Sequence, residues 1–472
     1  MSTRKALAFS YLDRYSALGL FVITSMIIAR LLTPAQVGVY SITMIMIGFV
    51  SPFRDFGASQ YLIYEKELTT ERVRSVWTVQ LSLGLALALL IFSLRDVAAN
   101  FYREPLISDI MVVVAVNSLC IPFGALTSAW LTRELRFDRL AIIRFSSNLI
   151  GSATSIILAW NGYGPISLAY GSLLTVLATA LVATFYRPKH FPWLPGIREI
   201  RRVLGFGLSI SGFTFANIAY LSVPELLLGY IQGMHATGLY GRAQGLVQLC
   251  ERLIMDSVHS VALPAFTKLQ KEKQELGGAF IYSVSMISVL GWTLLSYFAI
   301  MAYPIIILLY GDQWKDSVDL ARLLCVAMCF RLIIALCPSM LIAAGRRWIV
   351  LLLATLNLLI QAALCLVGAT LGLEELGMAV LAASAILTLF WLYVAHTIVG
   401  FSRRSFLASQ WRSFLVTAVS MVAPVVTILI FGIRPTEIFL PLLISGVGMA
   451  AGFLLAVSQL QHPIWIEIRR IL

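Results

Sequence analysis

The chain alternates between long apolar runs and short polar loops. A helix of roughly 18 or more apolar residues can cross a bilayer, and about fourteen such runs can be counted along the sequence. Their approximate limits are 7–31, 36–58, 73–94, 107–131, 141–160, 165–186, 204–231, 236–265, 279–309, 319–344, 347–371, 376–399, 411–433 and 437–459. The pattern predicts an all-α polytopic membrane protein with about fourteen transmembrane helices.

Composition agrees with a lipid environment. Of the 472 residues, 59% are hydrophobic and only 12% are charged, and no stretch resembles a separate soluble domain. Asp13 and Arg14 interrupt the first apolar run, which therefore does not resemble a signal peptide, and we expect this span to be retained.

Basic residues predict the orientation in the membrane. They concentrate in every second loop, as expected of loops that stay in the cytoplasm. Arg4 and Lys5 near one end, with Arg469 and Arg470 near the other, predict that both termini are cytoplasmic. The net charge of +12 is explained by these loops, so we expect no nucleic-acid partner.

The sequence also repeats at an offset of about 200 residues, which is typical of transporters built from two related halves. Gly38 aligns with Gly238, and Tyr40 aligns with Tyr240. The repeat predicts two six-helix lobes followed by two extra C-terminal helices. The predicted divisions are 1–190 for the first lobe, 191–202 for a cytoplasmic linker, 203–400 for the second lobe and 401–472 for the last two spans and the C-terminus.

Several charged residues lie inside apolar runs. An ionised group near the bilayer centre costs at least about 2.5 kcal/mol, so such groups are expected to face a polar interior or each other. They are Asp13, Arg14, Arg54, Asp55, Glu225, Arg242, Arg252, Asp256 and Arg331.

Counting outward from the predicted turns suggests pairings among these charges. Asp13 and Arg14 reach the same depth as Arg54 and Asp55, so two crossed ion pairs are plausible there. Around the second hairpin, Glu225 could pair with Arg242 in the same way.

The run at 236–265 carries a polar face. At about 100° per residue, Arg242, Arg252 and Asp256 fall within one arc of a helix. A guanidinium group offers forked donors that suit a pyrophosphate or an acidic sugar, so these arginines are candidate substrate ligands. The alternative is that each cation is neutralised by an acid and only holds helices together.

We rank the candidates accordingly. The predicted substrate-binding residues are Arg242, Arg252 and Arg331, followed by Arg14 and Arg54. No organic cofactor is expected, but a buried carboxylate could bind a proton or a sodium ion and couple transport to a gradient. The candidates for ion coupling or ion pairing are Asp13, Asp55, Glu225 and Asp256.

Nearly the whole chain resembles a known family, the polysaccharide-transport branch of the multidrug/oligosaccharidyl-lipid/polysaccharide exporter superfamily, which includes Wzx-type lipid-linked oligosaccharide flippases. The resemblance rests on five motifs in order: Ala29-Arg-Leu-Leu-Thr-Pro-Ala-Gln-Val-Gly-Val-Tyr40, Arg54-Asp-Phe-Gly57, Gly238-Leu-Tyr-Gly-Arg-Ala-Gln244, Leu263-Pro-Ala-Phe266 and Tyr310-Gly-Asp-Gln-Trp314.

The resemblance implies a V-shaped pair of lobes around a central cavity. It implies export of a polyprenyl-pyrophosphate-linked oligosaccharide repeat unit across the inner membrane by alternating access, for exopolysaccharide, capsule or O-antigen biosynthesis. Expected partners are this substrate, membrane lipids, and a polysaccharide polymerase with its export machinery.

Other chemistries lack their motifs. The sequence has no P-loop, no His-Glu-x-x-His and no Cys-x-x-Cys, so we expect neither an enzyme nor a metal site. A membrane-embedded polymerase would usually carry a large outer loop. Two alternatives with the same fold remain: a multidrug cation antiporter, whose cavity should contain acids rather than arginines, and a flippase for a peptidoglycan lipid intermediate.

Overall fold

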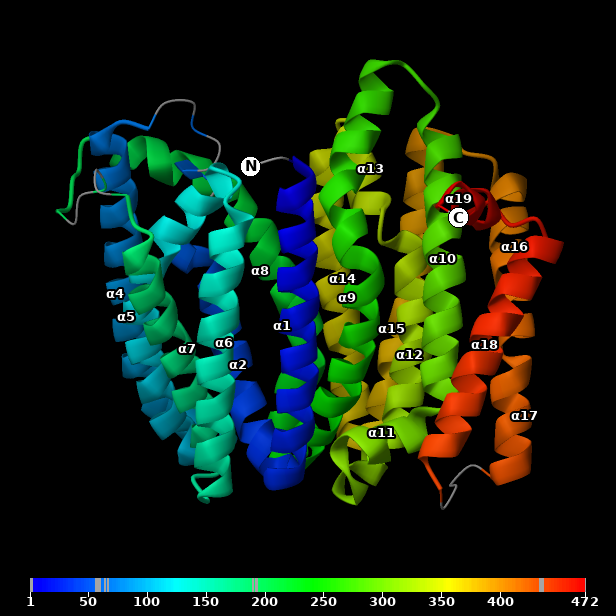
Figure 1. Ribbon diagram of the computed structural model, residues 1–472, viewed down its shortest axis with the longest axis horizontal. Helices are drawn as coiled ribbons and strands as arrows, with labels where there is room; N and C mark the ends of the chain where they lie inside the picture. Colours follow the sequence, from blue (N-terminus) through cyan, green and yellow to red (C-terminus); the bar gives the residue numbers. More distant parts are fainter. Residues whose placement is uncertain are drawn as a thin grey trace. The chain divides into compact units, whose positions relative to one another are not determined.

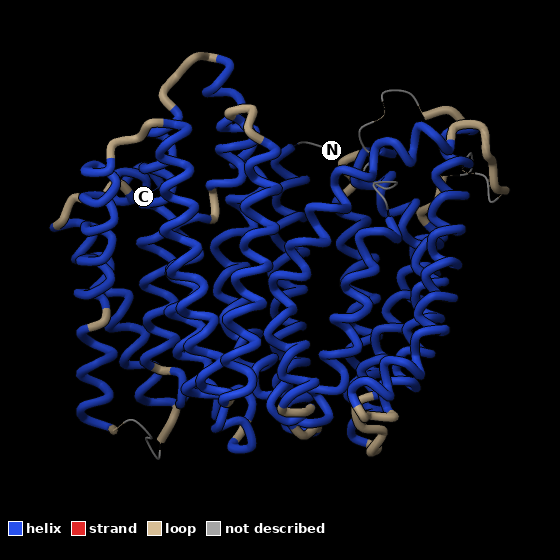
Figure 2. Tube along the Cα trace, turned by 180° about the vertical axis from the view of Figure 1, so that it is seen from behind, coloured by secondary structure: helices blue, strands red, loops and turns tan. Residues whose placement is uncertain are grey.

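The chain is helical throughout the part that the structure describes. This computed structural model describes residues 3–55, 61–62, 65, 68–188, 191, 194–432 and 437–471, and no strand occurs in these ranges (Figure 2). Side-chain surroundings are described for most of these residues, with exceptions that include 3–14, 52–55, 201–214, 256–257 and 259–260. The predicted all-α class is confirmed.

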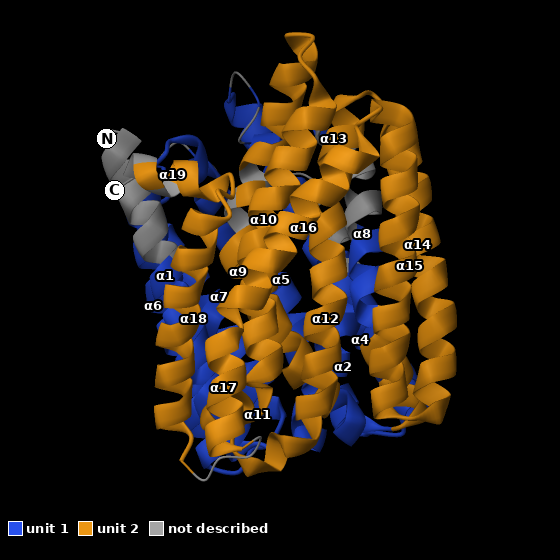
Figure 3. Ribbon diagram, turned by 90° about the vertical axis from the view of Figure 1, so that its right-hand side faces the viewer, with its two compact units in different colours: residues 1–222, 233–238 blue, residues 223–232, 239–472 orange. Residues whose placement is uncertain are grey.

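The chain forms two compact units, which are coloured separately in Figure 3. Unit 1 comprises Met1–Ser222 together with Gly233–Gly238, and unit 2 comprises Val223–Gln232 together with Leu239–Leu472. The predicted linker at 191–202 lies wholly within unit 1. The predicted V shape and central cavity concern the relation between the units and stay predictions.

Unit 1 is a bundle of long helices (Figure 1). Within it, α4 packs against α5, α5 and α6 pack against α7, and α1 packs against α6. Its helices are α1 (Thr3–Leu31), α2 (Pro34–Asp55), α4 (Thr70–Tyr102), α5 (Leu106–Arg133), α6 (Phe137–Trp160), α7 (Ile166–Phe185) and most of α8 (Ile200–Ile231).

Unit 2 combines long helices with shorter segments (Figure 1). Here α10 packs against α12 and α16, α15 against α12 and α14, and α18 against α16 and α17. The elements are α9 (Met234–Lys271) apart from its first five residues, which belong to unit 1, then α10 (Leu276–Ile300), α11 (Ala302–Tyr310), η1 (Asp312–Ser317), α12 (Val318–Ile334), α13 (Cys337–Ala343), α14 (Arg347–Leu371), α15 (Leu373–Val399), α16 (Arg403–Ser420), α17 (Val422–Phe431), α18 (Phe439–Gln459) and α19 (Ile464–Ile471).

The helices agree with the predicted apolar runs. Ten helical segments of the described chain are long and apolar enough to cross a membrane, and three shorter apolar stretches belong to α1, α2 and α8. The chain is therefore a multi-pass membrane protein. Helix α9 is not among these segments, because its charged residues lower its hydropathy, so the number fourteen stays a prediction.

Three of the predicted runs are split into two helices by proline. A proline has no N–H group to donate to the carbonyl four residues earlier, so a helix tends to break there. Helices α10, α12 and α16 end at Ile300, Ile334 and Ser420, each four residues before a proline: Pro304, Pro338 and Pro424. The rule is not general, since Pro122, Pro224 and Pro264 lie inside continuous helices.

The aligned glycines Gly38 and Gly238 lie at a close crossing of the first turns of α2 and α9. A Cβ atom at Gly38 would collide with the carbonyl oxygen of Met234, and one at Gly238 would collide with the carbonyl oxygen of Pro34. Pro34 and Met234 are the first residues of their helices, so the crossing is reciprocal. Each glycine allows the other helix's backbone to approach.

The segment before α8 is held against α4. The Gly196 N–H donates to Thr78 Oγ1 at 2.7 Å, and the Thr78 hydroxyl donates to the Gly196 carbonyl at 2.8 Å. The Glu199 N–H donates to Ser75 Oγ at 3.2 Å, and Arg198 forms an exposed 2.6 Å ion pair with Glu71. This part of the predicted linker is therefore hydrogen-bonded to α4 and is not a free connection.

Candidate functional site

Five of the predicted charged candidates lie in helices whose side chains are outside the described residues. Their positions in the chain place them in α1, at the end of α2 and in α9. They are Asp13, Arg14, Arg54, Asp55 and Asp256. Their predicted ion pairs and roles stay predictions.

Arg242, in the third turn of α9, lies against two aromatic rings. Its guanidinium carbon is 5.1 Å from the centre of the Tyr310 ring and 5.0 Å from that of Trp314. Both rings are buried, Trp314 completely, and their centres are 6.4 Å apart at an angle of 65°. Contacts of a cation with aromatic faces stabilise by about 0.5–2 kcal/mol, with the larger values at desolvated sites.

The motif Tyr310-Gly-Asp-Gln-Trp314 forms this aromatic site through a sharp turn. Gly311 adopts φ 95° and ψ 173°, a conformation that favours glycine, and it ends α11. The following η1 helix returns the chain, with the Trp314 N–H donating to the Gly311 carbonyl at 3.2 Å and Ser317 Oγ donating to the Trp314 carbonyl at 2.7 Å. The chain thus brings two rings, four positions apart, to one arginine.

The sequence analysis did not predict that Tyr310 and Trp314 contact Arg242, although both residues belong to one of its five motifs. The suggested partner of Arg242 was Glu225, which is half-buried in α8. Among the described residues, no ion pair joins Glu225 to Arg242. The aromatic contacts give Arg242 a stabilising role within unit 2.

Arg252 lies ten residues further along α9, or about 15 Å along the helix axis. Unlike Arg242, it is exposed. The next residues, Leu253 and Ile254, line an apolar groove with a volume of about 590 Å³. Arg252 itself is not among the residues that line this groove.

The apolar groove is formed by α9, α10 and α18. Its one hydroxyl, on Thr293, is engaged within the protein, since it donates to the Val289 carbonyl at 2.7 Å and lies 3.3 Å from Thr417 Oγ1. The groove can thus accept a hydrocarbon chain without leaving a polar group unsatisfied. Its lining residues are Leu253, Ile254, Val258, Met286, Ile287, Leu290, Thr293, Leu294, Met449, Ala450, Phe453 and Leu454.

Arg331 lies in the last turn of α12 and is half-buried. The two preceding residues are held by side chains from neighbouring helices: Trp292 Nε1 donates to the Cys329 carbonyl, and Thr388 Oγ1 donates to the Phe330 carbonyl, both at 3.0 Å. The end of α12 is therefore fixed next to its proline break. Arg331 is not among the residues that line the apolar groove, and its predicted contact with substrate stays a prediction.

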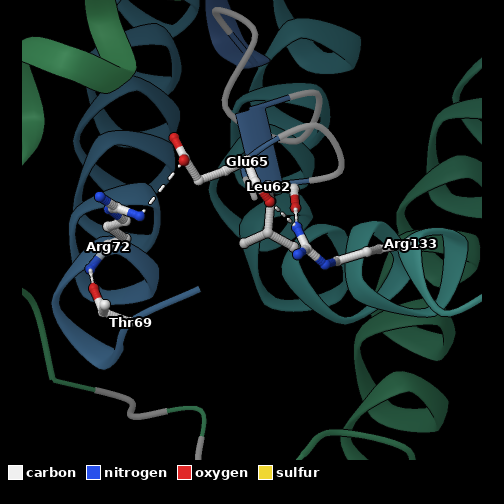
Figure 4. A network of polar contacts seen from close by, with 5 residues as sticks. All are labelled: Leu62, Glu65, Thr69, Arg72 and Arg133. Atoms are coloured by element: carbon white, nitrogen blue, oxygen red, sulfur yellow. Dashed lines mark hydrogen bonds and ion pairs between the residues drawn. The ribbon is translucent and has the colours of Figure 1, made fainter. Parts of the chain in front are cut away.

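A polar network in unit 1 joins Arg133 and Arg72 to the segment between α2 and α4 (Figure 4). Arg133, at the end of α5, donates through Nη1 to the carbonyl of Leu62 at 3.0 Å and to that of Glu65. The Glu65 carboxylate lies 3.5 Å from Arg72 Nη1, and Thr69 Oγ1 caps α4 by accepting from the Arg72 N–H at 3.3 Å. The network anchors the connection between α2 and α4.

Metal binding has no structural support in the described part of the chain. No group of three or more histidine, cysteine, aspartate or glutamate side chains there is arranged to hold a metal ion.

Sequence comparison identifies related proteins. The sequence model of a family described as "Polysaccharide biosynthesis protein" matches residues 27–319. The chain is 24% identical over 349 residues to a membrane protein in the cps region of Klebsiella pneumoniae, covering 73% of this chain and 72% of that protein. It is 22% identical over 339 residues to the lipopolysaccharide biosynthesis protein WzxC of Escherichia coli K12, covering 70% and 67%.

A third relative is the succinoglycan biosynthesis transport protein ExoT of Rhizobium meliloti. It is 23% identical over 324 residues, which cover 67% of this chain and 64% of ExoT.

Solved structures share the fold. The inward closed conformation of the lipid II flippase MurJ matches with a TM-score of 0.78 over 97% of this chain and 99% of that one, at 15% identity. An inward-facing multidrug MATE transporter of the MOP superfamily matches with a TM-score of 0.67 over 84% and 98%, at 16% identity. The family match covers more than half of the 472 residues, and the chain therefore belongs to the polysaccharide biosynthesis protein family.

Proposed function

We propose that this protein is a flippase that moves a polyprenyl-pyrophosphate-linked oligosaccharide repeat unit across the inner membrane by alternating access. Its product would supply exopolysaccharide, capsule or O-antigen biosynthesis. The family, and relatives named for lipopolysaccharide biosynthesis and succinoglycan transport, support this function. The fold shared with a lipid II flippase is consistent with it.

The observation that carries the proposal is that α9 contributes one wall of the apolar groove and also carries the exposed Arg252. The substrate has an apolar polyprenyl chain joined to a strongly anionic pyrophosphate. The groove of α9, α10 and α18 offers a hydrocarbon surface, and Arg252 is an exposed guanidinium with forked, charged donors on the same helix. One helix, α9, thus presents groups suited to both parts of such a molecule.

The two alternatives with this fold fit less well. A cation antiporter would use acids to attract its substrates, whereas the groove-lining residues of α9 are apolar and the exposed Arg252 of this helix is a cation. A flippase for a peptidoglycan lipid intermediate would need the same physical features. The relatives' names favour polysaccharide precursors over that substrate.

The remaining parts of the proposal follow from this function. We infer that the protein lies in the inner membrane with both termini cytoplasmic, as the basic loops predict. It translocates its substrate without covalent chemistry and passes it to a polysaccharide polymerase and export machinery. Glu225, with Asp55 and Asp256, stays a candidate for proton or sodium coupling.

Charge reversal tests the role of Arg252. We expect Arg252→Glu to reduce surface polymer at least tenfold without changing the amount of protein in the membrane, because it would repel the pyrophosphate. Lys268→Glu is the matched control, since Lys268 is exposed in the last turn of the same helix and lies outside the groove. Normal polymer levels with Arg252→Glu would show that this arginine does not contact the substrate.

A further inference from the structure

A second pocket lies at the end of unit 2 where α10 and α16 begin. It has a volume of about 290 Å³ and is lined by α10, α16 and the turn between α18 and α19. The residues that give it its character are Tyr282, Ser285, Ser405, Ser409, Arg412 and Pro463. We call it the serine-arginine pocket.

The donors of this pocket lie on one face of α16. Ser405, Ser409 and Arg412 follow each other at intervals of four and three residues, which places them in line along the helix. Within the described part of the chain, no carboxylate lies within ion-pair distance of Arg412, and neither Ser405 Oγ nor Ser409 Oγ forms a hydrogen bond. One guanidinium and two hydroxyls are thus available to an anion.

Ser285, which lines the pocket, belongs to a buried histidine network that forms this wall's inner support. His462 is fully buried, and its Nε2 lies 3.0 Å from Ser285 Oγ and 3.1 Å from Ser413 Oγ. The Ile464 N–H donates to His462 Nδ1 at 3.3 Å, so Nδ1 is an acceptor and the ring is neutral. Burial and then the charge of Arg412 lower the pKa of His462 to about 4, which places the Arg412 charge close to this wall.

The surroundings of the pocket are typical of a membrane–water boundary. The short helix α19 runs across the direction of the long helices (Figure 3), with Ile464 buried against α10, α16 and α18. Trp411, next to Arg412, is 60% exposed and stacks on Phe414 with ring centres 5.4 Å apart. Exposed tryptophan is enriched at the headgroup level of membranes.

Nearby charges favour an anion. Two carboxylates are close: Glu467 accepts a hydrogen bond from the Tyr282 hydroxyl at 3.1 Å, and Glu275 lies near Gly278. Exposed arginines outnumber them, since Arg403 and Arg404 begin α16 and Arg469 lies on α19. The basic residues of α16 also predict that this end of the unit is cytoplasmic.

We infer that the serine-arginine pocket binds the phosphate of an anionic phospholipid headgroup, such as that of phosphatidylglycerol. Arg412 supplies a forked, charged donor, and Ser405 and Ser409 supply hydroxyl donors. Basic pockets between transmembrane helices on the cytoplasmic side suit such headgroups. Exposed Trp411 and the amphipathic α19 place a lipid, rather than a soluble phosphate, beside the pocket. This inference does not depend on the transported substrate.

Native mass spectrometry of the purified full-length protein tests the inference. The protein is titrated with dioleoylphosphatidylglycerol and, separately, with dioleoylphosphatidylcholine. We expect the wild type to retain one phosphatidylglycerol in preference to phosphatidylcholine, and Arg412→Gln to weaken this binding about tenfold, as expected for loss of a charged hydrogen bond. Arg404→Gln removes the same charge from the same helix outside the pocket and should weaken binding much less than Arg412→Gln.

Three results would overturn the inference. The first is unchanged binding by Arg412→Gln, and the second is an equal loss in Arg404→Gln, which would indicate only a diffuse basic surface. The third is displacement of the lipid by millimolar inorganic phosphate, which would indicate a site for soluble phosphate. Should Arg412→Gln fail to purify, Ser409→Val provides a second variant, for which weaker lipid binding supports the site and unchanged binding contradicts it.

Discussion

The two arginines of α9 differ in what surrounds them. Arg242 lies on the buried rings of Tyr310 and Trp314, whereas Arg252 is exposed. The sequence ranked them equally, because both lie on one polar face of a helix. We now expect Arg242 to stabilise unit 2 and Arg252 to contact substrate.

The aromatic contacts predict a stability effect at Arg242. We expect Arg242→Gln to lower the free energy of unfolding by about 1–2 kcal/mol, because the rings lose their cation. The free energy of unfolding of Arg242→Lys should lie between those of Arg242→Gln and the wild type, since a compact ammonium cannot stack as a planar guanidinium does. Thermal unfolding in detergent measures the effect, with Arg404→Gln as the control, because Arg404 is exposed in another helix of unit 2 and its replacement should leave unfolding unchanged. Equal losses in the Arg242→Gln and Arg404→Gln variants would contradict this assignment.

His462 predicts a dependence of stability on pH. Its pKa is about 4 in the folded protein and 6.5 ordinarily, so between these values the unfolded chain binds more protons. The contribution of neutral His462 to the free energy of unfolding is complete above pH 6.5 and is lost as the pH falls toward 4. Protonation of Nδ1 would also oppose the hydrogen bond from the Ile464 N–H.

We therefore expect the unfolding temperature of the wild type to fall between pH 7 and pH 5. His462→Asn, which cannot titrate, should show a smaller fall over the same range. His235→Asn is the control, because His235 is exposed and its replacement should leave the wild-type slope unchanged. If the unfolding temperature of His462→Asn fell with pH as steeply as that of the wild type, the pH dependence would come from other groups.

The helices were more predictable than their interruptions. Each predicted run has a helical counterpart, since apolar length is a local property of the sequence. The breaks at Ile300, Ile334 and Ser420 could also have been read from the prolines four residues later, yet Pro122 and Pro264 lie in unbroken helices. Whether a proline breaks a helix depends on neighbouring groups, and the local sequence does not contain that information.

The glycine crossing shows what an internal repeat can and cannot predict. Gly38 and Gly238 were aligned from the sequence as equivalent positions. That they also pack reciprocally on the carbonyls of Met234 and Pro34 follows only from the tertiary structure.

This crossing predicts that a single added methyl group is harmful. Gly38→Ala and Gly238→Ala place a Cβ atom against backbone, which cannot move as a side chain can, so we expect each to cost about 2 kcal/mol or more. Gly245→Ala is the control on α9, because nothing lies within 4 Å of a Cβ there. Unfolding temperature and the monodisperse yield from size-exclusion chromatography report the effect, and a Gly238→Ala variant as stable as Gly245→Ala would disprove the close approach.

At the scale of the whole molecule, the family and fold agree with what the sequence predicted. Three of the five motifs that carried the resemblance lie at defined structural features: Gly38 and Gly238 at the helix crossing, and Tyr310 with Trp314 at Arg242. The apolar groove could not be predicted, because it is formed by α9, α10 and α18, which are distant in sequence. The charged residues were visible in the sequence, but their surroundings required the tertiary structure.

The central claim is that this protein moves a lipid-linked repeat unit outward. The most direct measurement is the sidedness of that lipid in the inner membrane of a clean deletion strain, scored by access of a periplasmic sugar-modifying probe. We predict that the repeat unit stays inaccessible in the deletion strain and becomes accessible when the wild-type chain is restored, but not when Arg252→Glu is expressed at the same level. An accessible repeat unit and normal surface polymer in the deletion strain, with no paralogue present, would contradict the account.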